Sequence, residues 1–99
     1  MIVTFDVDSS VLVVTGEEDQ VTSGRRRRAI SRALGAERDV TVDLRGLWFA
    51  DSSLMLDLAV LARRLRADGR QMLLRGPQPH IRRLIELMGV DRLPAVALA

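Results

Sequence analysis

The chain contains no cysteine, no tyrosine and no lysine, and its aromatic residues are one tryptophan and two phenylalanines. The absence of cysteine excludes disulfides and thiolate chemistry, so nothing demands an oxidising compartment. With a single histidine, His80, a transition-metal site is not expected, and we predict neither a metal nor another cofactor. No apolar run approaches the ~20 residues of a membrane span, and residues 1–7 do not resemble a secretion signal. We therefore expect one cytoplasmic domain, residues 1–99, with no membrane insertion.

All fifteen basic residues are arginine, and the formal net charge is only +2. This charge is too small to indicate nucleic-acid binding by itself. The run Arg25–Arg28 keeps nucleic-acid binding open as one alternative, but few aromatic side chains are present to stack on bases. We therefore predict no direct nucleic-acid partner.

Apolar periodicity and turn residues predict alternating strands and helices. A half-buried strand at 3–7 is expected to form a hairpin with a strand at 11–14 that is covered on both faces. Helices are predicted from Thr22 or Ser23 to about residue 34, from Ser52 or Ser53 to about residue 67, and from Pro77 or Pro79 to about residue 88. Further strands are predicted at 40–44 and 71–74, with an edge strand at 93–98. The expected fold class is α/β, a mixed β-sheet of four to five strands flanked by helices.

The most informative stretch is residues 47–54, where an apolar strand runs directly into the second helix. Asp51, Ser52 and Ser53 stand at this junction, and each can accept a hydrogen bond from the free N–H groups of a first helical turn. A serine at this position is exposed and faces the positive end of the helix dipole. A phosphate added there would gain backbone donors, while Asp51 would oppose its charge of about −1.5 to −2.

Three segments together resemble the STAS family, named for sulfate transporters and anti-sigma factor antagonists. They are Gly16-Glu17-x-Asp19 with Thr22, Asp43-Leu44-Arg45-Gly46-Leu47-x-Phe49-x-Asp51-Ser52-Ser53, and Gly69-Arg70-x-Met72 continuing to Gly89-Val90-Asp91. Their order and spacing cover nearly the whole chain. The resemblance implies a STAS-like fold and a bacterial partner-switching protein of the antagonist branch, which regulates transcription through a sigma factor and is not an enzyme.

In that branch, the resemblance implies that Ser52 is phosphorylated by an anti-sigma factor that is also a serine kinase. The unmodified protein would bind this kinase, the phosphorylated form would release it, and a serine phosphatase would reset the switch. The expected partner surface comprises Asp19, Asp51, Ser53, Leu54, Leu56, Asp57 and Val60. The sequence leaves open whether the free protein is a monomer or a weak homodimer. A second interpretation is a STAS subunit that docks permanently to a membrane transport assembly, with Ser52 as a helix cap.

Several positions depart from the family pattern. Leu54 stands where relatives commonly have glycine, and its bulk is expected beside Ser52. Glu18 and Arg26 replace residues that are usually aliphatic, and we predict either that they form a partly buried ion pair or that both stems extend to water. On the second helix, Leu56 and Val60 lie opposite the sheet-facing leucines, as either scattered surface residues or a partner-binding patch.

The remaining candidates are interpreted structurally. Phe49 is expected to point inward, and Trp48 is expected to be packed under a helix on the other face of the sheet, with an exposed partner-anchoring position as the second interpretation. We place His80 in the first turn of the last helix, facing solvent. Nothing brings His80 near Ser52, so a catalytic triad is not predicted, and no residue is assigned a catalytic role.

Overall fold

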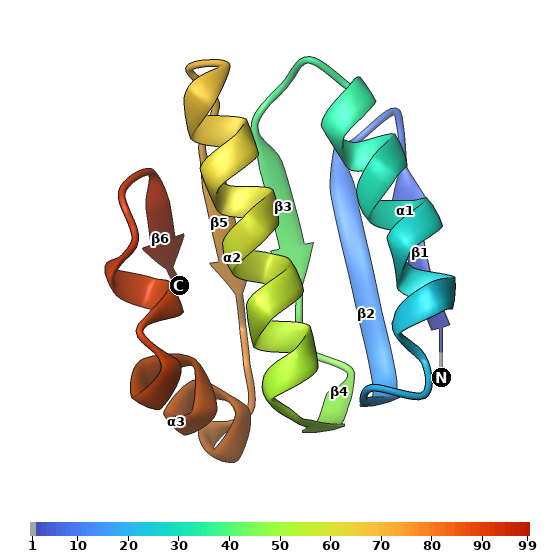
Figure 1. Ribbon diagram of the computed structural model, residues 1–99, viewed down its shortest axis with the longest axis vertical. Helices are drawn as coiled ribbons and strands as arrows, with labels where there is room; N and C mark the ends of the chain where they lie inside the picture. Colours follow the sequence, from blue (N-terminus) through green and yellow to red (C-terminus); the bar gives the residue numbers. More distant parts are fainter. Residues whose placement is uncertain (1) are drawn as a thin grey trace.

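The computed structural model describes residues 2–99 and has an α/β architecture (Figure 1). Its strands are β1 (Ile2–Asp6), β2 (Val11–Glu18), β3 (Val40–Asp43), β4 (Leu47–Ala50), β5 (Met72–Arg75) and β6 (Val96–Leu98). The helices are α1 (Ser23–Gly35), α2 (Ser52–Ala67) and α3 (Pro79–Met88), followed by a single 3-10 turn, η1 (Val90–Arg92). The α/β prediction is confirmed, although the described sheet has six strands instead of four or five.

The sheet is mixed, with the order β1-β2-β3-β5-β6. The predicted hairpin is confirmed, because β1 and β2 pair antiparallel from Ile2 opposite Thr15 to Asp6 opposite Val11. The β2–β3, β3–β5 and β5–β6 pairs are parallel, as strands joined through helices require. The additional strand β4 pairs in parallel with the far end of β2, beyond an irregularity between Gly16 and Glu17. This pairing extends β2 to Glu18 and brings β4 to the end of the sheet where α2 begins (Figure 1).

Helices α1 and α2 lie over the same face of the sheet and run parallel to each other (Figure 1). Burial alternates along the strands, so that Val40 and Val42 of β3 are buried while Thr41 and Asp43 are only half-buried. In β2, Leu12 and Val14 are buried, but Val11 and Val13 are not. The prediction that both faces of this strand are covered is therefore wrong. Valine side chains tolerate a half-exposed sheet face because β-branched residues pack well on a pleated surface.

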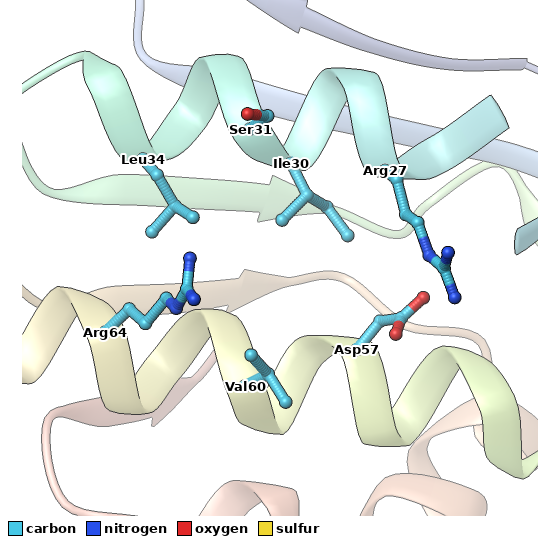
Figure 2. Close-up of a pocket in the computed structure, with 7 residues that line it drawn as sticks. All are labelled: Arg27, Ile30, Ser31, Leu34, Asp57, Val60 and Arg64. Carbon is cyan, nitrogen blue, oxygen red and sulfur yellow. The ribbon is translucent and has the colours of Figure 1, made fainter. Parts of the chain in front are cut away.

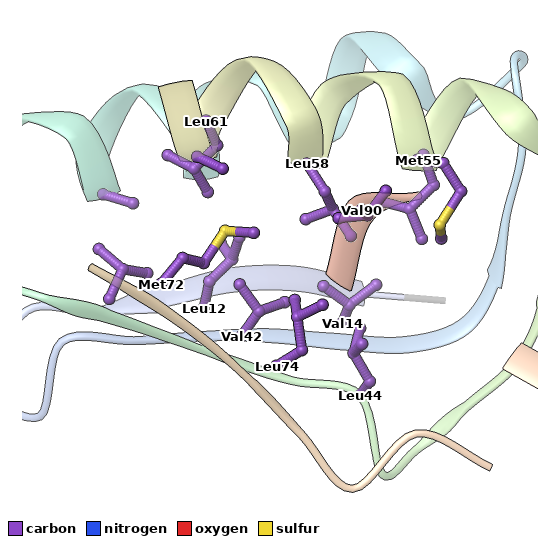
Figure 3. Packing of buried hydrophobic residues seen from close by; sticks show 14 of the residues in the cluster. Leu12, Val14, Val42, Leu44, Met55, Leu58, Leu61, Met72, Leu74 and Val90 are labelled. Atoms are coloured by element: carbon purple, nitrogen blue, oxygen red, sulfur yellow. The ribbon is translucent and has the colours of Figure 1, made fainter. Parts of the chain in front are cut away.

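One hydrophobic core fills the space between the helices and the sheet (Figure 3). Met55, Leu58 and Leu61 of α2 are buried against the core-facing residues of the central strands. These strand residues include Leu12, Val14, Val42, Leu44, Met72 and Leu74. Full burial of each such side chain contributes about 1.5–3 kcal/mol relative to exposure. The core therefore fixes the position of α2, and with it the position of its first turn.

The ends of the helices follow their local sequence. Helix α2 spans Ser52–Ala67, as predicted, and α3 begins at Pro79, where a missing N–H costs no intrahelical bond. Gly89 ends α3 in the left-handed conformation at φ 76°, as expected of a C-terminal glycine. Gly35 is the last residue of α1 and has no positive φ, whereas Glu37 does. On α3, Met88 belongs to the predicted apolar stripe but is exposed.

Candidate functional site

The junction between β4 and α2 presents an exposed serine at the first position of a helix. Ser52 is exposed, and no hydrogen bond of its hydroxyl is found among residues 2–99. The helix is capped instead by Asp51, whose Oδ1 accepts a hydrogen bond from the Ser53 backbone N–H at 2.9 Å. The same carboxylate oxygen accepts a hydrogen bond from the Ser53 hydroxyl. Asp51 therefore performs the capping role that leaves the Ser52 hydroxyl free.

Asp51 also holds the loop between β2 and α1 against the start of α2. Its Oδ2 accepts a hydrogen bond from the Gln20 N–H at 3.2 Å, and its own N–H donates to the Glu18 carbonyl at 3.1 Å. The hydrogen bond from the Ser53 hydroxyl, helped by the backbone N–H groups and the nearby Arg26 charge, lowers the pKa of Asp51 below 3.8. A negative charge therefore stands beside Ser52 at neutral pH.

The predicted partner residue Asp19 organises this neighbouring loop. Its Oδ1 accepts hydrogen bonds from the N–H groups of Val21, at 2.9 Å, and of Thr22, at 3.2 Å. Thr22 precedes α1 without capping it through its side chain, and its hydroxyl bonds to the Asp19 backbone instead. This turn leaves the Val21 side chain almost completely exposed. Asp19 and Asp51 thus lie in adjoining loops, linked through Gln20.

A buried arginine lies beneath the two loops. The side chain of Arg26 is 0% exposed and that of Glu18 is 1% exposed, and Arg26 Nη1 is 3.3 Å from Glu18 Oε1. The predicted ion pair is therefore confirmed, and its burial is complete, not partial. Arg26 also donates from Nε to Asp57 Oδ2 at 2.7 Å and from Nη2 to the Ser53 hydroxyl at 2.9 Å. Nη1 further contacts the Asp19 carbonyl at 2.9 Å.

The sequence did not reveal that Asp57 and Ser53 belong to this cluster. Ser53 is in part a structural link, because its hydroxyl donates to Asp51 and accepts from Arg26. Burial raises the pKa of Glu18 above 4.5, although the hydrogen bond and charge of Arg26 act in the opposite direction. The planar guanidinium suits this position because its five donors can serve several acceptors at once.

Exposed apolar side chains flank Ser52 on both sides along the chain. Trp48 is 55% exposed and Phe49 is 46% exposed, so the prediction that Phe49 points inward and Trp48 is packed under a helix is wrong. The reason is that β4 is a four-residue strand paired only with β2 among the described residues, at the end of the sheet. Leu56 of α2 is also 60% exposed, and Val60 is half-exposed.

Leu54 differs from the other predicted partner residues. Its side chain is 1% exposed and belongs to the hydrophobic core. It therefore cannot offer a surface to a partner, and its bulk does not stand beside Ser52 as expected. Helical geometry explains this burial, because Leu54 shares the sheet-facing stripe with Leu58 and Leu61.

His80 is exposed at the start of α3, and its Nε2 is 2.6 Å from the carbonyl oxygen of Trp48. This contact ties α3 to β4 and gives the imidazole a structural partner. Within residues 2–99, no cluster of three or more His, Cys, Asp or Glu side chains is arranged to hold a metal ion. In the same part of the chain, no helix is long and apolar enough to span a membrane.

A family model described as "Mlab, STAS domain" matches residues 1–97, which is nearly the whole chain. A comparison with curated proteins finds no match. The mixed sheet and its flanking helices, described above, are consistent with a STAS-like fold. The chain therefore belongs to the STAS family of regulatory binding domains, which are generally not enzymes.

Proposed function

We propose that this protein is an anti-sigma factor antagonist-like regulator that binds an anti-sigma serine kinase and is switched by phosphorylation of Ser52. The observation that carries the proposal is the exposed hydroxyl of Ser52 at the first position of α2, with no hydrogen-bond partner among the described residues. A kinase can reach such an oxygen without first breaking a contact. The neighbouring Ser53 hydroxyl is engaged by Asp51 and Arg26, which favours Ser52 as the acceptor.

The electrostatics of the junction suit a switch. The start of α2 offers the positive end of its dipole and the first-turn N–H groups other than that of Ser53, which donates to Asp51; both stabilise an added phosphate. The phosphate adds a charge of about −1.5 to −2 beside the ionised Asp51. A partner surface that packs closely against unmodified Ser52 would then meet two adjacent negative groups and lose its dry contact.

The surface around Ser52 has the composition of a binding site. Trp48 and Phe49 precede the serine on β4, Leu56 follows it by one turn of α2, and all three are exposed. Val21 extends from the loop that Asp51 holds through Gln20. Aromatic side chains are enriched among residues that dominate binding energy, so we propose that Trp48 and Phe49 anchor the partner. Asp19, Asp51 and Asp57 would form the polar part of this interface.

The switch requires no large change of fold. The Arg26 cluster joins the end of β2, the start of α1 and the first turns of α2 through short contacts. These contacts hold the binding surface in one arrangement before and after modification. Phosphorylation would therefore act locally on the interface, and a serine phosphatase would restore the binding form.

The direct test is incubation of the protein with its cognate anti-sigma kinase and ATP, followed by intact mass measurement. We expect the mass of one phosphoryl group to be added to the wild type and to a Ser53→Ala variant, and none to be added to Ser52→Ala. A chain that binds its partner but gains no phosphate would instead be a permanently docked subunit, as in a membrane transport assembly. That outcome would refute the switch.

A further inference from the structure

A groove between α1 and α2 lies on the helical side of the molecule, away from the sheet. It has a cavity volume of about 340 Å³ and is lined by residues of both helices (Figure 2). Ile30 and Leu34 of α1 face Val60 of α2 across it, and these three side chains provide its apolar surface. Its charged lining consists of Arg27, Asp57 and Arg64 (Figure 2). An apolar groove of this kind, between two parallel helices, can accept a third helix.

The charge around the groove is one-sided. Helix α1 exposes Arg25, Arg27, Arg28 and Arg32, and α2 exposes Arg63, Arg64 and Arg66. None of these arginines forms an ion pair within residues 2–99. Asp57 is the one acidic residue in the two helices, and its Oδ2 is already bound by Arg26 at 2.7 Å. Asp57 also lines the groove, on the side of Arg27, but its single charge does not balance the seven exposed arginines of the two helices.

The chain has this local excess although its formal net charge is only +2. Arginines at the start of α1 also oppose its dipole, and the parallel helices place both positive ends at the same end of the molecule (Figure 1). Concentrated like charge destabilises the free protein and attracts an oppositely charged surface. The guanidinium groups are suited to bind carboxylates through two parallel hydrogen bonds.

We propose that the α1–α2 groove binds an acidic amphipathic helix of a partner protein. The apolar stripe of this helix would cover Ile30, Leu34 and Val60, and its flanking carboxylates would pair with Arg27 and Arg64. A nucleic acid has no apolar ridge to fill the groove, and a flat lipid surface does not fit a concave one. The inference deepens the proposed function, on which it rests, by specifying the chemistry of the partner.

The test uses the full chain carrying Ser52→Ala, so that phosphorylation of Ser52 plays no part. A displayed library of helix-forming peptides, each with an apolar stripe at i, i+3, i+4 and i+7, is selected for binding to this variant. The flanking positions are randomised among glutamate, glutamine and lysine. We expect glutamate to be enriched in the selected peptides. Enrichment of glutamine or lysine would overturn the proposal.

The affinity of the best peptide is then measured for two double variants that carry equal charge reversals. Arg27→Glu with Arg64→Glu should weaken binding by about tenfold or more, as should Val60→Asp. Arg82→Glu with Arg83→Glu changes the charge equally on exposed positions of α3 and should leave binding unchanged. Equal losses in both double variants would overturn the groove as the site. Tighter binding of a single-stranded oligonucleotide or of phosphatidylserine vesicles at the groove would overturn the helix as its occupant.

The two proposals fail separately. If Ser52 gains phosphate but acidic helices do not bind the groove, the switch stands and the groove inference is wrong. If acidic helices bind the groove but Ser52 gains no phosphate, the groove inference stands and the switch is wrong.

Discussion

Replacement of Arg26 by leucine tests whether the buried ion cluster holds the site together. The substitution leaves the Glu18 carboxylate, 1% exposed, without its cation. It also removes the hydrogen bonds from Nε to Asp57 and from Nη2 to Ser53. Removing one partner of a buried ion pair costs about 3–5 kcal/mol, because the other charge stays buried and uncompensated.

This cost is large for a small domain, whose total stability is about 5–15 kcal/mol. A loss of 1 kcal/mol lowers the melting temperature of a domain of this size by about 4–8 °C, so Arg26→Leu should lower it by at least about 12 °C. Replacing Glu18 by leucine as well removes the stranded carboxylate. The double variant should recover part of the loss, with a coupling energy of about 0.5–3 kcal/mol in a double-mutant cycle.

The pH dependence of the free energy of unfolding gives a sharper test. Burial already raises the pKa of Glu18, and loss of Arg26 removes the influences that oppose this rise. Above pH 4.5, the folded variant keeps a proton on Glu18 that the unfolded chain releases. The free energy of unfolding therefore falls as pH increases from this value, and levels off above the pKa of the folded state. The deficit of Arg26→Leu relative to wild type should be smaller near about pH 4, where the loss of the contacts with Asp57 and Ser53 remains, than at neutral pH.

Urea unfolding followed by far-UV circular dichroism measures these differences at each pH. The matched control is Arg26→Leu combined with Glu18→Gln, which carries no titrating group at position 18. Its deficit relative to the single variant Glu18→Gln should not vary with pH across this range. A deficit of Arg26→Leu that is equally independent of pH, or a coupling energy of zero, would refute the reasoning.

Three further predictions concern the cap of α2 and a second buried arginine, Arg70. The free energy of unfolding in urea of Ser52→Ala should lie within about 0.5 kcal/mol of the wild-type value, because Asp51 provides the cap. Asp51→Ala should lower this free energy by about 1 kcal/mol. A larger loss in Ser52→Ala than in Asp51→Ala would contradict the assignment of the cap to Asp51. The lowered pKa of Asp51 contributes stability above pH 3.8 that is lost as pH falls below it, so Asp51→Asn should flatten this part of an acid unfolding curve monitored by circular dichroism. Arg70 is buried and donates to the Leu34 carbonyl at 2.8 Å near the end of α1. Arg70→Met should therefore lower the free energy of unfolding by about 1–3 kcal/mol, measured by thermal unfolding. A loss no larger than that of the exposed Arg83→Met would contradict this prediction.

Much of the fold could be predicted because local signals and packing agree. Pro79 and Gly89 mark the limits of α3, and the spacing of leucines in α2 places its buried face correctly. The Glu18–Arg26 pair could also be predicted, since the resemblance to the family leads one to expect aliphatic residues at these two positions, and they face the interior. In each case, the sequence contains the physical cause of the structure.

Other features depend on tertiary arrangement. The alternation in β4 gives no sign that, among the described residues, the strand pairs only with β2, and this pairing is why Trp48 and Phe49 are exposed. Residues Asp57 and Ser53 are 31 and 27 positions from Arg26, so their contacts with it depend on how α1 and α2 pack. The continuous apolar run of β2 likewise does not show that helices α1 and α2 lie over the same face of the sheet.

The candidate site also combines features that the local sequence predicts with features that depend on tertiary arrangement. The exposure of Ser52 follows from its place at a helix start, which the sequence shows. The absence of a hydrogen bond between its hydroxyl and residues 2–99 does not, because it depends on Asp51 capping the helix through Ser53. The groove between α1 and α2 could not be predicted either, since its apolar residues come from two separate segments.

The central claim is that negative charge at Ser52 decides whether a partner stays bound. The most direct measurement compares the proteins retained from a lysate of the native cells by the Ser52→Ala and Ser52→Asp forms of the full chain. We predict that a serine-kinase partner is retained by the alanine form and lost from the aspartate form. Retention of the same kinase in equal amount by both forms would contradict the account.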